Sequence, residues 1–365
     1  VAYQMSACHA MEKAIGVFDH VDPEIRALRN LLYCGEWIES HALHVFMLHA
    51  PDFLGYDDAI KMAKDHGETV KAALELKKIG NEIVRIMGGR EIHPVNACVG
   101  GFWRAPAKSE FAEVRKQLDR ALEIAVQSVH FAAGLPFPDL EYDYEFISLR
   151  HPDEYPFNEG RIVSSKGVDI DVSEYEDVFE EVHLKQSTSL HSVIKEGRRS
   201  YFVGPLARFN LNFDKLTPIA RRESEAVGFL PEERNSFKSI IARAVEMVFA
   251  CEEAISLIDN YKPPEKSHVE VQHHPAKGYG ATEAPRGILY HRYTVGDYGL
   301  IRDAKIVPPT SQNQGTIERD LRDFADRNLD MNKDKLTWHC EQVSRNYDPC
   351  ISCSCHFLKL NIEEE

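Results

Sequence analysis

Residues 23–50 read PEIRALRNLLYCGEWIESHALHVFMLHA, and this stretch decides the class of fold. Its apolar residues, such as Ile25 and Leu28, recur at steps of three and four, which is the spacing of one buried face of a helix. Asp22, immediately before this stretch, is a favourable helix cap, and Pro23 is a favourable first helical residue. The sequence therefore predicts a long buried helix here and a protein built around such helices.

The rest of the chain adds further helical patterns and short strands. The other long helical patterns cover residues 57–87, 109–133, 231–261 and 334–345. Residues 145–205 alternate short apolar runs with turn residues, and we interpret them as a β-containing insertion with helical pieces. Residues 262–280 are loop-like, and Ile288–Val295 and Leu300–Val307 alternate as two strands. We predict an α+β fold, predominantly helical, with a long-helix core in one large domain over residues 1–365.

Composition restricts the possible functions. The net charge is −15, from 58 acidic and 43 basic residues. Such a surface does not suit a nucleic-acid binder, and it suits a protein that docks to protein partners. No apolar run approaches the roughly 18 residues of a membrane span, so we expect a chain that is not membrane-embedded. Helical spacing begins at Val1 without a capping residue, so we expect Val1 to be an internal residue of a longer polypeptide.

Residues 348–356, DPCISCSCH, carry the strongest chemical signal. Thiolates three positions apart, as in Cys350 and Cys353, can converge on one soft metal centre, and His356 follows at ligand spacing. Spacing alone leaves three alternatives: a zinc or iron–sulfur site, a thioredoxin-like redox pair, or a structural role. The clustering of cysteines at this end of a long chain favours metal chemistry in a reducing compartment over a disulfide framework.

Five stretches together resemble the large, catalytic subunit of nickel–iron hydrogenases. They are ESHALHVFMLHAPD at 39–52, GGREIHPVNACVGG at 88–101, TEAPRG at 282–287, PTSQN at 309–313 and DPCISCSCH at 348–356. Each motif is short, but their order is that of the family and they extend over nearly the whole chain. The Thr-Glu-Ala-Pro-Arg and Cys-Ile-Ser-Cys variants look most like the cytosolic, cofactor-linked branch that includes sulfhydrogenase α subunits.

The resemblance implies reversible, heterolytic cleavage of H₂ at a Ni–Fe(CN)₂CO centre. It implies that electrons leave through an iron–sulfur small subunit, then through further flavin and iron–sulfur subunits to NAD(P) or ferredoxin. It also implies a cytoplasmic location and maturation by nickel chaperones and a dedicated protease. In the family's pattern Cys350 is a terminal nickel ligand that could accept the proton, and Cys353 bridges nickel and iron. His356 and the backbone carbonyl of Ile306 correspond to ligands of a Mg²⁺ ion.

The resemblance also assigns roles around the metals. Arg286 would hydrogen-bond a cyanide or cover the open site, since its guanidinium is a fixed fork of donors. Pro285 and Thr310 line the diatomic ligands in the family, and Asp348 and Asp52 would fix Arg286. His41 resembles a histidine near the bridging thiolate. The alternatives are an ion-paired surface arginine at Arg286, a helix-end acid at Asp52 and a hydrogen-bonded core histidine at His41.

Two features depart from the family's mature form. An Arg-x-Cys-Gly-x-Cys motif that supplies the other two nickel ligands is expected immediately before Val1, and Tyr3 stands where the family usually has His. Residues 357–365 resemble the extension that the protease removes after His356, so the sequence predicts an unprocessed, nickel-free precursor. The competing interpretations are a complex I-type electron-transfer scaffold, and a structural zinc protein with Cys350, Cys353, Cys355 and His356 as ligands.

Overall fold

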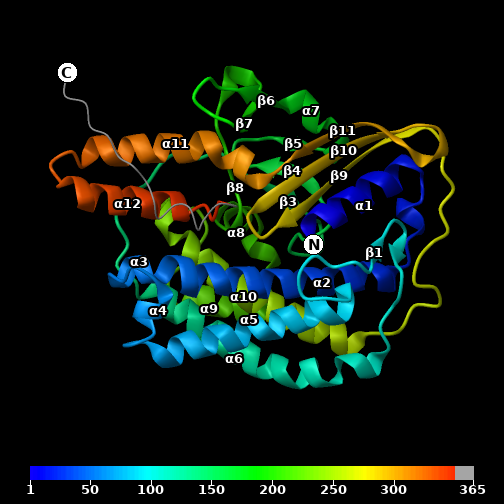
Figure 1. The fold of residues 1–365 in the computed structure, drawn as a ribbon, viewed down its shortest axis with the longest axis horizontal. Coiled ribbons are helices and arrows are strands. Elements are labelled where there is room, and N and C mark those ends of the chain that lie inside the picture. Colours follow the sequence, from blue (N-terminus) through cyan, green and yellow to red (C-terminus); the bar gives the residue numbers. More distant parts are fainter. Residues whose placement is uncertain (350–365) are drawn as a thin grey trace.

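The computed structural model describes residues 1–349, and its larger layer consists of long helices. Helices α2, α5, α6 and α10 pack side by side in the lower half of Figure 1. Asp22 caps α2 by accepting from the backbone N–H of Glu24 at 2.8 Å, and Pro23 is its first residue, as predicted. The α-helices are α1 (Ala2–Ala14), α2 (Pro23–Ala42), α3 (Ala50–Leu54), α4 (Ala59–Met62), α5 (Gly67–Gly88), α6 (Ala112–Ala133), α7 (Tyr175–Val178), α8 (Pro205–Asn212), α9 (Pro218–Ala226), α10 (Ser239–Asn260), α11 (Pro309–Arg327) and α12 (Lys333–Arg345).

Four small sheets form the second layer, whose largest strands lie next to α1 in Figure 1. The sheet orders are β5-β4-β3-β8, β11-β10-β9, β6-β7 and β1-β2, and only the β3–β8 pair is parallel. The strands are β1 (Ala97–Cys98), β2 (Gly101–Phe102), β3 (Phe146–Arg150), β4 (Arg161–Ser164), β5 (Asp169–Ile170), β6 (Phe179–His183), β7 (Leu190–Ile194), β8 (Phe202–Val203), β9 (Ala276–Ala284), β10 (Gly287–Val295) and β11 (Ile301–Val307).

Strand β9 touches the backbone of α1 directly, and two glycines allow this approach. A Cβ atom on Gly278 would lie 2.0 Å from the carbonyl oxygen of Ala10, and one on Gly280 would lie 2.4 Å from that of Ser6. No side chain fits at such distances, because nonbonded carbon and oxygen atoms stay about 3.3 Å apart or more. The small residues of β9 thus fix the position of α1 on the sheet.

Two large hydrophobic clusters and a small third one around Val295 make up the interior of the described residues. The larger cluster joins the long helices around Trp37, Leu118 and Val245. The smaller one lies between β3, β4 and β10 and includes Ile147 and Ile288. The segment between residues 145 and 205 therefore divides its apolar side chains between the β9–β11 sheet and the helical cluster, which includes Phe146 and Phe202.

The fold confirms the predicted class and corrects several elements. The 57–87 pattern contains two helices, because the chain leaves the helical conformation at His66 and restarts at Gly67. The 231–261 pattern is helical only from Ser236, where Asn235 caps a 3-10 turn that leads into α10. Strand β9 and helices α8, α9 and α11 were not predicted. None of the helices within residues 1–349 combines the length and apolarity of a membrane span.

A π-helical segment, Leu43–His49, joins α2 to α3. It follows α2 without a break and carries His44 and His49, whose side chains are buried. Such segments are rare and occur frequently at functional sites. Residues 23–50 are therefore continuously helical, and the helix geometry changes after Ala42.

Candidate metal centre

Arg286 and Asp348 form the contact that joins the two strongest motifs. Arg286 Nε donates to the backbone carbonyl of Asp348 at 2.6 Å, and Nη2 donates to its Oδ1 at 3.2 Å. The Asp348 side chain is 1% exposed, and its backbone is left-handed with φ of +47°. Non-glycine residues rarely adopt that conformation and do so mostly at functional sites. Asp348 thus contacts Arg286 as expected, and the catalytic roles of the two residues stay predictions.

The loop that carries Arg286 lies between β9 and β10 and is packed against the start of α8. Gly204, the residue before α8, has φ of +119°, and a Cβ atom there would lie 2.8 Å from the carbonyl oxygen of Arg286. Pro285 is buried and Arg286 is partly exposed. The orientation of the Arg286 guanidinium is therefore set by the packing of its backbone against Gly204 and by its bonds to Asp348.

Thr310 and Ile306 lie where β11 runs into α11. Ile306 pairs with His291 of β10, and Thr310 is the second residue of α11. Gln312 ties this junction to the residues just after Arg286, because its Nε2 donates to the carbonyl of Ile288 at 2.6 Å and to that of Val307 at 3.1 Å. The first turn of α11 is thus held against the start of β10, which follows directly after Arg286.

The structure contradicts the expectation that Asp52 fixes Arg286. Its carboxylate binds the guanidinium of Arg345, at 2.5 Å from Nε and 2.8 Å from Nη2, and not that of Arg286. Both side chains are almost fully buried. Burial raises the pKa of Asp52, and the charge of Arg345 opposes that rise. Asp52 therefore anchors α12, which ends three residues before Asp348, and its own catalytic role stays a prediction.

Two buried histidines have defined tautomers. His44 Nε2 lies 2.8 Å from the backbone carbonyl of Arg345, which can only accept, so Nε2 carries the proton. His41 Nε2 lies 2.9 Å from Glu246. Burial lowers the pKa of both imidazoles, so they are neutral at pH 7. Their Nδ1 atoms are bare acceptors and have no hydrogen-bond partner among residues 1–349. His41 thus makes a buried hydrogen bond to Glu246, and its role near the bridging thiolate stays a prediction.

A fully buried ionic network connects His41 to the loop of Arg286. Arg208 on α8 donates Nε and Nη2 to Glu246 at 2.8 Å each, and Nη1 to Glu283 at 2.9 Å. Burial would raise the pKa of Glu246, but Arg208 and His41 lower it below the usual range. Burial raises the pKa of Glu283, which receives only one N–H of the guanidinium. Glu246 therefore retains the charge that pairs with Arg208.

The described side chains do not form a complete ligand set for a metal. Within residues 1–349, no group of three or more His, Cys, Asp or Glu side chains could hold a metal ion. The predicted ligands Cys350, Cys353 and His356 lie outside the described residues. Asp348 contacts the guanidinium donors of Arg286, which suit the surroundings of an anionic group and cannot themselves bind a metal. They fit an anionic thiolate–metal centre held by the cysteines of the following motif.

Sequence reasoning missed Arg208, Glu246 and Arg243. Arg243 is fully buried on α10, donates to Ser239 at 2.9 Å, and burial lowers its pKa. Charged residues inside helical patterns are ordinarily assigned to the solvent face. The only signal in the sequence was a charged position on the apolar stripe of 239–250, where Arg243 and Glu246 lie three residues apart.

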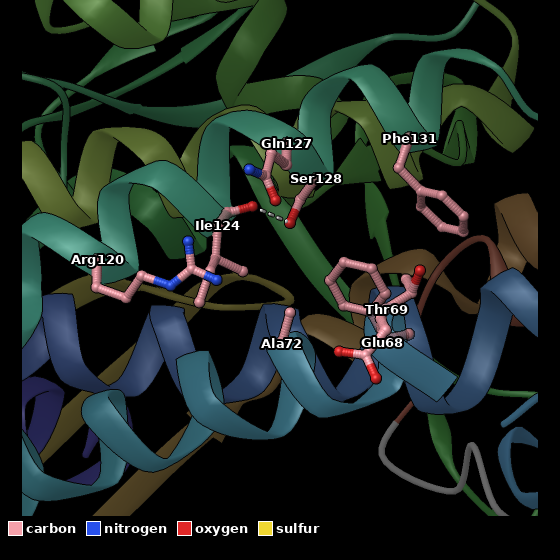
Figure 2. A pocket seen from close by; sticks show the side chains of 9 residues that line it. Glu68, Thr69, Ala72, Arg120, Ile124, Gln127, Ser128 and Phe131 are labelled. Carbon is pink, nitrogen blue, oxygen red and sulfur yellow. Dashed lines mark hydrogen bonds between the residues drawn. The ribbon is translucent and has the colours of Figure 1, made fainter. Parts of the chain in front are cut away.

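A separate cavity of about 260 Å³ opens between α5 and α6. Figure 2 shows Glu68 and Arg120 at its rim and Phe131 along its wall, and Ser128 donates to the carbonyl of Ile124 at 2.7 Å. Phe46 of the π-helical segment also lines it. The cavity contains none of the predicted site residues, so it is distinct from the candidate metal centre.

Comparison with known proteins identifies the class to which this fold and site belong. A family model described as nickel-dependent hydrogenase matches residues 195–356. The α subunit of sulfhydrogenase 1 from Pyrococcus furiosus is 35% identical over 98% of this chain and 84% of its own length. The β subunit of the NAD-reducing hydrogenase HoxS from Cupriavidus necator is 25% identical over 98% of this chain and 82% of its own.

Solved structures agree on the fold. An NAD⁺-reducing NiFe hydrogenase in the H₂-reduced state superposes with a TM-score of 0.85 at 23% identity, over 96% of this chain and 84% of that one. The NiFeSe hydrogenase of Dm. baculatum gives a TM-score of 0.72 at 20% identity, over 96% and 86%. The chain belongs to the nickel-dependent hydrogenase large-subunit family, whose members are oxidoreductases acting on H₂. The family resemblance and the α+β fold inferred from the motifs are both confirmed.

Proposed function

We propose that this chain is the catalytic subunit of a hydrogenase that cleaves H₂ heterolytically and passes the electrons to an iron–sulfur subunit. The observation that carries the proposal is the bond of Arg286 to Asp348. It brings the Glu-Ala-Pro-Arg-Gly loop into contact with Asp348, which is two residues before Cys350 in the sequence. The names of the relatives support a multisubunit assembly, and the NAD-reducing relative supports NAD as the eventual acceptor. Ferredoxin is the other acceptor that the motif resemblance implies.

Cys350 and Cys353 would hold the nickel–iron centre, which when bound supplies the electrophilic site for H₂. His356 and the carbonyl of Ile306 would hold Mg²⁺. Carbon monoxide and cyanide as iron ligands are part of the proposal and follow from the resemblance.

The chain's own residues would handle the proton and the charge. The Sγ of Cys350 would accept the proton, because a metal lowers a thiol pKa from its ordinary value of about 8.5. Arg286 would present its guanidinium charge to the anionic centre, held in position by Asp348. His41 contributes a neutral ring whose proton is fixed on Nε2 by Glu246, so it would present Nδ1 as an acceptor only. Asp52 and Arg345 would keep α12 in place behind the motif.

The proposal covers maturation and organisation as well. Residues 1–365 would form one catalytic domain with residues 145–205 as an insertion, and residues 357–365 would be removed by a protease once nickel is in place. Nickel chaperones and a cytoplasmic setting would accompany this route. Intact-mass measurement of the subunit from its own host would show whether its polypeptide ends at His356.

The decisive experiment compares two cysteine variants of the whole complex purified from its host. We expect Cys350→Ser to lose nickel and H₂-dependent reduction of a viologen dye. The control Cys98→Ser, at a partly exposed cysteine on β1, should keep both. Unchanged nickel content and H₂ oxidation in Cys350→Ser would refute the proposal, and zinc at one per chain without iron would support a structural zinc protein instead.

A further inference from the structure

Arg208 uses every hydrogen-bond donor that it has. An arginine side chain carries five N–H donors, one on Nε and two on each terminal nitrogen. Three of them bind the carboxylates of Glu246 and Glu283, and the other two bind the carbonyls of Ala284 at 2.8 Å and Pro285 at 2.9 Å. The guanidinium is also stacked over Trp37, with its carbon 4.2 Å from the ring centre. It is fully buried, so none of these bonds competes with water.

These bonds fix the backbone that leads to Arg286. Trp37 Nε1 donates to the carbonyl of Glu283 at 3.1 Å, and Arg208 holds the next two carbonyls. Three consecutive carbonyls before Arg286 are therefore held by side-chain donors. The peptide orientation at Pro285 determines the direction in which the Arg286 side chain leaves the loop.

The same guanidinium orders the acid that contacts His41. Glu246 accepts from Arg208 through both oxygens, and its Oε2 faces His41 Nε2 while its Oε1 accepts from Tyr155 at 2.8 Å. The ionised carboxylate requires the proton of His41 to be on Nε2. One residue thus sets both the position of Arg286 and the tautomer of His41.

We propose that Arg208 is a positioning residue of the H₂ site, which orients Arg286 through the carbonyls of Ala284 and Pro285 and fixes His41 through Glu246. The inference rests on the proposed function for its kinetic part and on geometry alone for its structural part. Lysine cannot replace Arg208, since its three donors are on one atom and cannot reach two carboxylates and two carbonyls together.

The test uses the whole complex with Arg208→Lys, Arg286→Lys, the double variant and a matched control. The control is Arg29→Lys, because Arg29 is equally buried and makes a two-pronged pair with Glu12 between α1 and α2. A crystal structure of each single variant would locate the Arg286 guanidinium relative to Asp348. Dye reduction would give kcat and the KM for H₂.

We expect Arg208→Lys to shift the guanidinium of Arg286 by about 1 Å and to lower kcat about 100-fold, with KM changed less than about 2-fold. The double variant should be slower than Arg286→Lys alone by much less than 100-fold, because the route through Arg286 is already lost and only the route through His41 remains. Arg29→Lys should leave the Arg286–Asp348 contact and kcat unchanged.

Three results would overturn the inference: an unmoved Arg286 in Arg208→Lys, effects of Arg208→Lys and Arg286→Lys that multiply, or an equal loss in Arg29→Lys. If Arg286→Lys itself keeps full activity, the proposed role of Arg286 fails. The crystal structures would still decide whether Arg208 positions the loop.

Discussion

Replacing Gly278 by alanine tests the contact between β9 and α1. The added Cβ would lie 2.0 Å from the carbonyl oxygen of Ala10 and 2.5 Å from the backbone nitrogen of Ala14. An ordinary carbon–oxygen contact is about 3.3 Å, so strand and helix must separate by about 1.3 Å. Both obstructing atoms belong to the backbone of α1, and no side-chain rotation can relieve them.

We expect Gly278→Ala to lower the free energy of unfolding by about 3 kcal/mol, the upper end of the range for substitutions that overpack a core. Gly67→Ala is the matched control, because a Cβ at Gly67, the first residue of α5, meets nothing within 4 Å. That change should stabilise by about 0.4–1 kcal/mol, through the lower entropy of the unfolded chain. Urea unfolding followed by circular dichroism would measure both variants against the parent chain. A Gly278→Ala variant within about 0.5 kcal/mol of the parent would refute the reasoning.

Three further changes test buried polar groups. Burial, Glu154 and Glu252 raise the pKa of Glu253 to about 7, so its stabilising contribution is complete below pH 4.5 and is lost as pH rises through 7. Glu253→Gln should remove about 2–3 kcal/mol of that pH dependence, measured as unfolding midpoints from pH 4.5 to 8, whereas Gln at the exposed Glu113 should not. Asp320 accepts the hydroxyl protons of Tyr144 and Tyr347, and Asp320→Asn should cost about 2 kcal/mol in urea unfolding; no loss would contradict the role of these bonds. Asp52→Asn leaves the guanidinium of Arg345 without its buried carboxylate partner and should cost about 3 kcal/mol, and an unchanged thermal midpoint would contradict that ion pair.

Local sequence was sufficient where apolar spacing and capping agreed. Helix α2 was predicted from its apolar stripe and from Asp22 and Pro23, and α12 from the pattern of 334–345. Strands β10 and β11 followed from alternation. The buried faces of α2 and β10 consist mostly of apolar side chains, so their periodicity is visible in one sequence.

The missed elements bury polar or small residues instead. Helix α11 places Gln312, Asn313 and Thr316 inside, where they bond to backbone groups of β8, β10 and neighbouring residues. Strand β9 is rich in Ala and Gly because it lies on the backbone of α1, so it lacks the β-branched residues that mark strands. Neither kind of burial produces a hydrophobic period.

One part of the candidate site could also be predicted from the sequence, and another part could not. Motif resemblance predicted the Arg286–Asp348 contact, which lies within the described residues. The network of Arg208, Glu246 and His41 joins residues up to 205 positions apart. Such pairings depend on how α2, α8 and α10 pack, and a single sequence contains no measure of that packing.

The π-helical segment Leu43–His49 also explains why Asp52 contacts Arg345. In an unbroken α-helix, 11 residues make about three turns, so Asp52 would share the face of His41. The wider turn of a π-helix holds about one additional residue, which rotates everything after it backwards by roughly 100°. Deleting one residue from this segment would therefore turn the carboxylate of Asp52 away from α12 while leaving His41 in place. The segment sets the angle between the part of the site at His41 and the part at Asp52. Its length is therefore as constrained as its composition.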